Sequence, residues 1–170
     1  MLQAQDIYVL LKIACLKDRD WTFRMLADEL FLSMSQIHLA LRRTSEVGLY
    51  LKNRKRVNLK ALEELLVHGV KYVYPPERGA LSYGIATAYA APPLNRTIVQ
   101  TNDPPPVWPS ETGDRVGYSI TPLHPNAPRA ALLDQEFYEL MALVDAIREG
   151  RARERQLAEK ELHSRLSHKN

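Results

Sequence analysis

A cluster of cationic side chains lies between residues 42 and 56. Glu46 is the only acidic residue in this stretch, which carries Arg42, Arg43, Lys52, Arg54, Lys55 and Arg56. Guanidinium and ammonium groups gathered on a short segment attract phosphate groups, above all those of a nucleic-acid backbone. A solvated surface loop is the alternative interpretation, and the charges alone favour neither one over the other.

A helix with one apolar face is predicted to start at Ser33, a residue type suited to cap it. Four apolar residues recur at helical spacing and mark the buried side: Met34, Ile37, Ala40 and Leu41. With about 100° per residue, the opposite side and its flanks carry Ser35, Gln36, His38, Leu39, Arg42, Arg43 and Glu46. Gly48 is expected to end the helix, because glycine tolerates left-handed backbone geometry.

The outward side of this helix has the residue types that read base edges in the major groove of DNA. Arg42 suits guanine or a phosphate, Gln36 suits adenine, and Leu39 suits the methyl group of thymine. Ser35 suits a phosphate, as do the free amides of the first helical turn. A helix face that is merely solvated is the alternative interpretation.

The basic residues after this helix are expected on a short hairpin, in which residues 49–51 pair with residues 56–57. Such a hairpin contacts phosphates and the minor groove, which sets affinity more than sequence preference. Together with the helix, it gives the full set of candidate DNA-contacting residues: Ser33, Ser35, Gln36, His38, Leu39, Arg42, Arg43, Lys52, Asn53, Arg54, Lys55 and Arg56.

Other kinds of chemistry find little support in the sequence. The five histidines have no pair of cysteines with which to complete a zinc-site motif, since Cys15 is the only cysteine. Ile85 occupies the position where a phosphate-binding loop beginning at Gly79 would need lysine. Asp134, Glu136 and Glu139 are more typical of a solvated helix than of acid–base catalysis. We therefore expect no metal site, no cofactor and no enzymatic activity.

The helix that starts at Ser33 needs neighbours to hold it in place. A first amphipathic helix is predicted from the apolar positions Ile7, Leu10, Leu11, Ala14 and Cys15. A second is expected to begin at Thr22 and to bury Phe23, Leu26, Ala27 and Leu30. A fourth is expected after Asn58, with Leu59, Leu62, Leu65 and Leu66 on its buried face. Residues 70–74 are β-branched and aromatic, which predicts a strand.

The order helix, helix, tight turn, helix, basic hairpin is the plan of a winged helix-turn-helix. The segments WTFRMLADEL (21–30) and MSQIHLALRR (34–43), followed by Gly48 and Leu49, resemble bacterial winged helix-turn-helix transcription regulators over about residues 5–74. Two residues depart from their pattern. Phe31 stands where glycine is usual, and a bulky residue disfavours positive φ, so the turn is expected to differ by one residue. Thr44 replaces a large apolar residue.

Proline divides the chain into three segments. All eleven prolines lie between Pro75 and Pro128, and proline disrupts helices. Residues 1–74 form the expected DNA-binding domain, with a net charge of +4. Residues 75–128 form a connector with short strands, such as 97–100 and 116–120, and residues 129–170 are expected to be helical. Leu140, Val144 and Ile147 on the last segment are the expected dimer contact.

A second resemblance concerns the rest of the chain. Residues 70–94 and 143–155 look like segments of uncharacterised bacterial proteins that pair a winged helix with a compact C-terminal part. Some of those proteins are thought to accompany toxin-like or defence enzymes. This resemblance implies an alternative role as a protein-interaction module or antitoxin that binds and restrains a partner enzyme.

The sequence thus predicts a mainly α fold with a small β-hairpin and a sequence-specific regulator of transcription. We expect a repressor that binds double-stranded DNA as a homodimer, since a single small domain reads few base pairs. Cys15 is the only cysteine, and no apolar run reaches the length of a transmembrane helix. A cytoplasmic protein with no membrane contact is therefore expected. An enzyme acting on nucleic acid is the weakest of the three readings.

Overall fold

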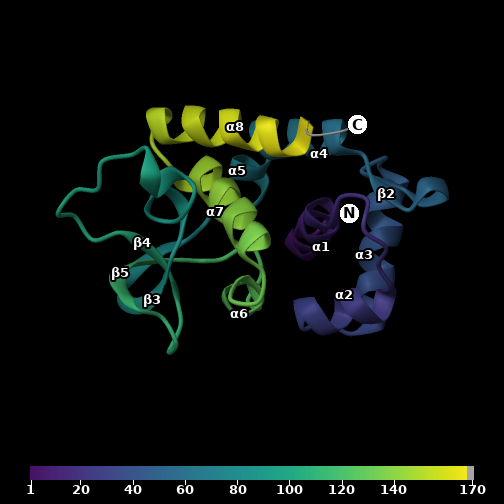
Figure 1. Ribbon diagram of the computed structural model, residues 1–170, viewed down its shortest axis with the longest axis horizontal. Coiled ribbons are helices and arrows are strands. Elements are labelled where there is room, and N and C mark those ends of the chain that lie inside the picture. Colours follow the sequence, from purple (N-terminus) through teal and green to yellow (C-terminus); the bar gives the residue numbers. More distant parts are fainter. Residues whose placement is uncertain (168–170) are drawn as a thin grey trace.

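The computed structural model describes residues 1–167, and these are mainly helical with two small sheets. In chain order the elements are α1 (Ala4–Leu16), α2 (Phe23–Leu30), α3 (Met34–Glu46), β1 (Tyr50–Leu51), η1 (Lys52–Arg54), β2 (Arg56–Val57), α4 (Leu59–His68), α5 (Val70–Val73), β3 (Arg78–Ala86), η2 (Ala88–Ala90), η3 (Leu94–Arg96), β4 (Pro106–Pro109), β5 (Arg115–Ile120), α6 (Ala127–Ala131), α7 (Gln135–Glu149) and α8 (Ala152–Ser167). The two sheets lie at opposite ends of the long axis, with α1 and α7 between them (Figure 1).

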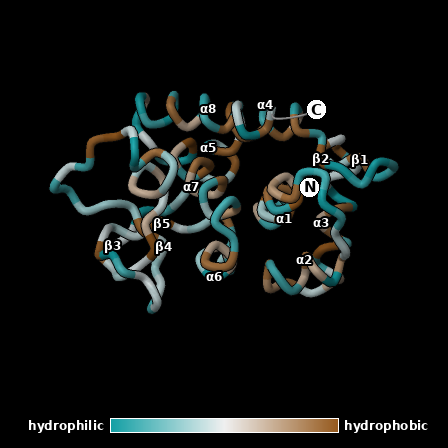
Figure 2. Tube along the Cα trace, viewed as in Figure 1, coloured by the Kyte–Doolittle hydropathy of each residue, from teal (hydrophilic) through white to brown (hydrophobic). Residues whose placement is uncertain are grey.

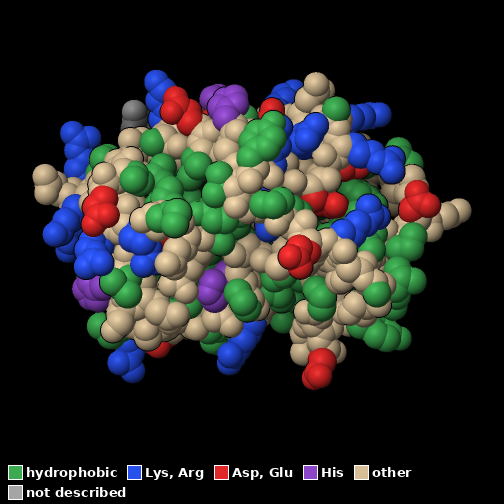
Figure 3. Space-filling model, turned by 180° about the vertical axis from the view of Figure 1, so that it is seen from behind, with side chains coloured by type: hydrophobic (Ala, Val, Ile, Leu, Met, Phe, Trp, Pro, Cys, Tyr) green, Lys and Arg blue, Asp and Glu red, His purple; other side chains and the backbone are tan. Residues whose placement is uncertain are grey.

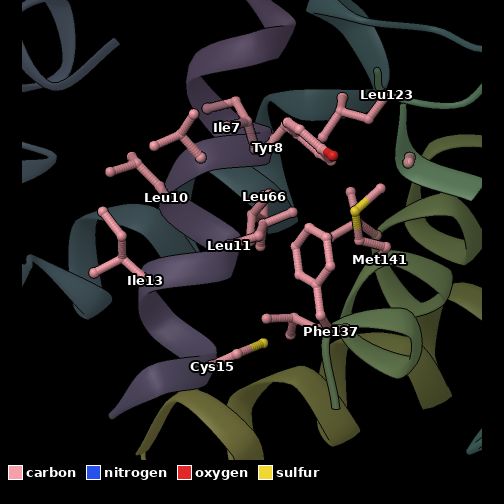
Figure 4. Close-up of a cluster of buried hydrophobic side chains, with 14 of the residues drawn as sticks. Ile7, Tyr8, Leu10, Leu11, Ile13, Cys15, Leu66, Leu123, Phe137 and Met141 are labelled. Carbon is pink, nitrogen blue, oxygen red and sulfur yellow. The ribbon is translucent and has the colours of Figure 1, made fainter. Parts of the chain in front are cut away.

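Helix α1 lies at the centre of the fold rather than on its surface. Ile7, Tyr8, Leu10 and Leu11 are fully buried, because α3 covers one side of the helix and α7 the other. Figure 4 shows Tyr8 and Leu11 on the side of α1 that faces Phe137 and Met141 of α7, and Leu10 on the opposite side. One continuous hydrophobic core therefore joins the N-terminal helices to the C-terminal ones.

The two helices before the basic hairpin begin where the sequence predicts. Thr22 caps α2 by accepting a hydrogen bond from the Met25 amide at 3.0 Å, and Ser33 caps α3 in the same way through Gln36. Thr44 on α3 is fully buried without a polar cost, since its hydroxyl donates to the carbonyl of Ala40 at 2.8 Å.

Between α2 and α3 the turn is made by Phe31 itself, which adopts left-handed geometry at φ 55°. The expectation that the turn differs by one residue is therefore wrong. Asn126 donates from its side-chain amide to the Phe31 carbonyl at 2.8 Å, and the Arg129 guanidinium lies 3.7 Å from the centre of the Phe31 ring. These contacts from the far end of the chain hold a conformation that is unfavourable for a bulky residue.

The predicted hairpin forms as a short antiparallel pair, with Tyr50 opposite Val57 and Leu51 opposite Arg56. Gly48 precedes it with φ 77°, as glycine permits, and Lys55 turns the tip with φ 49°. Asn58 then caps α4 by accepting from the Ala61 amide at 3.2 Å. The tip of this hairpin is the hydrophilic loop beside β1 in Figure 2.

Two predicted strands are absent. Residues 70–73 form the short helix α5, in which the Tyr74 amide donates to the Val70 carbonyl at 2.9 Å. Residues 97–100 follow η3, where the amides of Thr97 and Ile98 both turn back to the Leu94 carbonyl. Neither segment pairs with a strand, so local hydrogen bonds satisfy its backbone and override β propensity.

The proline-rich segment contains more sheet than the sequence indicates. Strand β3 pairs antiparallel with both β4 and β5, and β4 pairs parallel with β5, which closes a three-stranded barrel. Residues 116–120 lie within β5, as predicted. Pro106 and Pro109 stand at the two ends of β4, where a missing amide is tolerated. Gly84 of β3 passes so close to the Trp108 carbonyl that a Cβ atom would lie 2.1 Å from its oxygen.

The C-terminal helices belong to the same core. Leu140, Val144 and Ile147 are at most 3% exposed because α7 packs against α1, α5 and α8. The expectation that these three residues form a dimer contact is therefore wrong. Helix α8 buries Leu162 and Leu166 against α4 and α7, so the apolar side of α8 packs against its own chain. Among residues 1–167 no helix combines the length and apolar character needed to cross a membrane.

Candidate nucleic-acid interface

The outward face of α3 is free of other elements. Ser35, Leu39 and Arg42 are exposed, whereas Ile37 and Ala40 on the opposite side are fully buried. The helical periodicity therefore placed this face correctly, but Met34, which was predicted on the buried side, is 42% exposed. The Arg42 side chain is 70% exposed, and among residues 1–167 its one ion pair is with Glu46, one turn along the helix at 3.9 Å. An exposed pair of this kind is weak, so Arg42 can turn toward another anion.

Ser33 and Gln36 serve the start of α3. The Ser33 hydroxyl accepts from the Gln36 amide at 3.1 Å, and the Gln36 side chain accepts from the Ser33 amide at 2.8 Å. This reciprocal pair is a capping box. The side-chain amide of Gln36 also donates to Gln5 at 3.3 Å. Reading of adenine by Gln36 would require these bonds to break, and Ser35 is left as the free hydroxyl of the first turn.

Arg43 does not belong to the exposed face. Its guanidinium forms a two-pronged ion pair with the fully buried carboxylate of Asp6, at 2.6 and 2.8 Å. Those hydrogen bonds hold the pKa of the Arg43 guanidinium above its ordinary value. Asp6 also accepts from the Gln3 amide, so the pair fastens α3 to the start of α1. Arg43 is therefore a structural residue in this fold, contrary to its predicted role in DNA contact.

His38 flanks the outward face within a group of aromatic rings. Its imidazole stacks on the Phe23 ring, with 4.0 Å between centroids and 14° between planes. Trp21 meets the same Phe23 ring edge-on at 5.7 Å. Phe23 is only half-buried, so the prediction that it belongs to the buried stripe of α2 is wrong. No role was predicted for Trp21, although two aromatic residues that flank the N-cap Thr22 were a usable signal.

The basic hairpin presents its charges on two sides. All five residues from Lys52 to Arg56 are exposed. Lys52 and Lys55 face α3, whereas Arg54 and Arg56 face α4. Arg56 pairs with Asp18 at 3.1 Å, and both side chains are mostly exposed. The predicted hairpin residues thus form one cationic projection beside the outward face of α3.

A groove of about 940 Å³ lies between α3, the hairpin and the start of α2. We call it the aromatic groove. One wall carries Trp21, Phe23 and His38, and the rim carries Arg42, Lys52, Lys55 and Glu46. Figure 3 shows Lys and Arg side chains gathered at this end of the molecule, on the left of the view. The arrangement offers cations for phosphates, a helix face for base edges and ring faces for a flat partner.

Within residues 1–167, no group of three or more His, Cys, Asp or Glu side chains is placed to hold a metal ion. His168, one of the five histidines, lies outside the described residues. In comparisons with known proteins, no protein-family model, no curated protein and no solved structure matched this chain.

Proposed function

We propose that residues 1–74 form a winged helix-turn-helix and that the chain is a sequence-specific, double-stranded DNA-binding repressor of transcription. The observation that carries this proposal is the juxtaposition of an exposed α3 face with the cationic hairpin. A helix of this kind fits the major groove, and the hairpin then reaches the neighbouring phosphates as the wing.

In this proposal the residues divide between two tasks. Arg42 and Leu39 contact base edges, because they project from the middle of the exposed α3 face. Ser35, Lys52, Arg54 and Lys55 contact phosphates on either side of this face, where they supply affinity without sequence preference.

The test is a fluorescence-anisotropy titration with a duplex from the protein's own promoter and with a random duplex of equal length. We expect tighter binding to the promoter, and about tenfold weaker promoter binding for Arg42→Ala, since a good base contact is worth about 1–3 kcal/mol. Arg153→Ala is the matched control, because Arg153 is exposed on α8. Equal affinity of the parent for both duplexes would contradict sequence-specific reading.

A repressor of this size needs a second copy to read a useful number of base pairs. With α7 buried, we propose that the second copy binds the outer face of the barrel. Leu81 and Tyr83 on β3 are 62% and 68% exposed, and Val116, which lies opposite Tyr83 on β5, is 50% exposed. Adjacent apolar side chains that face solvent are typical of an interaction surface. Both Arg115 and Asp114 border the face, so it offers charges of each sign to its own copy.

Light scattering of the purified protein at micromolar concentration tests this interface. We expect a dimer for the parent chain and a monomer for Tyr83→Lys, because two lysines would be buried near the two-fold axis. Val99→Lys is the control, since Val99 is 87% exposed in a loop outside the sheet. A monomeric parent, both free and on DNA, would show that the dimer proposal is wrong.

The same exposed face favours a second candidate function, in which the chain binds and restrains a partner protein such as a toxin-like enzyme. The two functions differ in what covers the hairpin. If Arg54 and Lys55 are shielded from lysine- and arginine-modifying reagents in the complex purified from cells without DNA, the partner occupies the basic end and DNA binding loses its support. If these two residues react freely, the outer face of the barrel is the only surface left for a partner protein to bind.

A further inference from the structure

The aromatic groove has a wall that an intact duplex does not use. Phosphates are held by cations and amides, and a protein reaches the bases of a duplex only at their edges. Yet Trp21 and the stacked pair of Phe23 and His38 line the groove with ring faces and edges. In duplex DNA the flat surfaces of the bases are covered by their neighbours, so these rings are left for a different flat partner.

We propose that the aromatic groove binds a small planar aromatic anion. A flat ring can stack in an offset manner against Trp21 or His38, as aromatic pairs prefer. Its carboxylate or phosphate then lies toward Lys52 and Lys55, which line the same groove. Glu46 is the only acidic residue that lines the groove, and it is paired with Arg42 at 3.9 Å. The balance of charge therefore selects an anion over a cation.

The dimensions of the groove agree with this class of ligand. Small-molecule sites have volumes of about 300–1,000 Å³, with mostly apolar linings and a few polar groups, and this groove measures about 940 Å³. Leu41 and Tyr50 at its base are each 5% exposed and belong to the core. A rigid core below a partly exposed ring wall gives a site that exists before the ligand arrives, which lowers the entropic cost of binding.

Occupation of the groove has a regulatory consequence that rests on the proposed function. The ligand would engage Lys52 and Lys55, the same cations that we assign to phosphates. A ligand that binds the free protein but not the DNA complex lowers the apparent affinity for DNA by mass action. The proposed ligand is therefore an inducer that releases the protein from DNA.

The binding step is tested on the full-length chain without DNA, by isothermal titration calorimetry. The probes are 2-naphthoate, an aromatic carboxylate, and adenosine 5′-monophosphate, an aromatic phosphate. The preferred one identifies the source of the anion. The matched controls are 2-naphthalenemethanol, which keeps the ring but not the charge, and hexanoate, which keeps the charge but not the ring. We expect each control to bind about tenfold more weakly than the better probe, a difference of about 1.4 kcal/mol.

Two variants locate the site. Lys52→Ala combined with Lys55→Ala removes two exposed charges and should weaken the better probe about tenfold, while circular dichroism stays unchanged. Trp21→Ala should weaken it by a similar factor through loss of ring contact. Arg153→Ala, on α8, should leave it unaltered.

Absence of heat for both probes up to about 5 mM, a concentration that covers a Kd of 1 mM, would overturn the proposal. So would equal binding of the probes to the parent and to the double lysine variant. A probe that binds while the promoter duplex does not would uphold the site and refute the proposed DNA-binding function. Binding of the promoter duplex without binding of either probe would refute the ligand site alone. Failure of the ligand site and failure of the DNA-binding function are therefore distinguishable.

Discussion

Replacing Lys52, Arg54 and Lys55 together by alanine is expected to weaken promoter binding by about two orders of magnitude at low salt. Each cation that neutralises a phosphate releases condensed counterions, which adds about 0.9 to the slope of log affinity against log salt. Loss of three such contacts should therefore make the slope shallower by about 2.7. Arg56 is left in place because it is paired with Asp18. The measurement is a set of anisotropy titrations at four or more salt concentrations.

A control with the same change in net charge separates local contact from overall attraction. Arg151, just before α8, and Arg153 and Lys160 on α8 are exposed, so their triple replacement by alanine removes three charges outside the interface. We expect this control to lower affinity only slightly and to keep the parent's slope. If the hairpin variant also keeps that slope, the hairpin does not contact phosphates and the wing assignment is wrong.

The sequence correctly predicted features that depend on neighbouring residues, namely the helix caps and the two sides of α3. Thr22, Ser33 and Asn58 each cap a helix where predicted, because a cap depends on residues three positions away. The buried and exposed sides of α3 also followed from periodicity alone, since Ile37 and Leu39 fall on opposite sides of the helix.

Features that depend on distant residues were not predictable. Arg43 has the same sequence signature as Arg42, and only the fold reveals that Asp6, 37 positions away, neutralises it. The turn keeps its place at Phe31, contrary to the prediction, for a similar reason, since Asn126 contacts the Phe31 carbonyl across 95 positions of the chain. The predicted dimer contact was wrong because the apolar face of α7 indicates only that this face is buried. It does not indicate whether the same chain or a second copy covers it.

The barrel and the helices are joined by Asp145, and its loss is expected to be the most destabilising single change. Asp145 is 1% exposed on α7. Its carboxylate accepts from the Trp108 indole at 2.6 Å, from the Thr87 hydroxyl at 2.7 Å and from the Arg148 guanidinium at 2.7 Å. Arg148 in turn donates to the Tyr74 carbonyl at 2.8 Å. One carboxylate thus connects β4, α5 and the segment after β3 to α7.

Asp145→Ala leaves a buried guanidinium without its counter-charge and two buried donors without an acceptor. Breaking one partner of a buried ion pair costs about 3–5 kcal/mol, which for a chain of this length lowers the Tm by roughly 10 °C. Thermal unfolding followed by circular dichroism gives the value. Asp145→Asn, which keeps an acceptor oxygen but not the charge, should fall between the parent and the alanine variant.

The position of Asp145 also allows the two ends of the molecule to be tested apart. Asp20→Ala, at an exposed site in the loop between α1 and α2, is the control and should shift stability by less than about 0.5 kcal/mol. Below its own Tm, the Asp145→Ala variant should keep the parent's affinity for promoter DNA, because α1 lies between α7 and the end of the molecule that carries α3 and the hairpin (Figure 1). A Tm equal to the parent's would mean that the network around Asp145 does not hold the barrel to the helices.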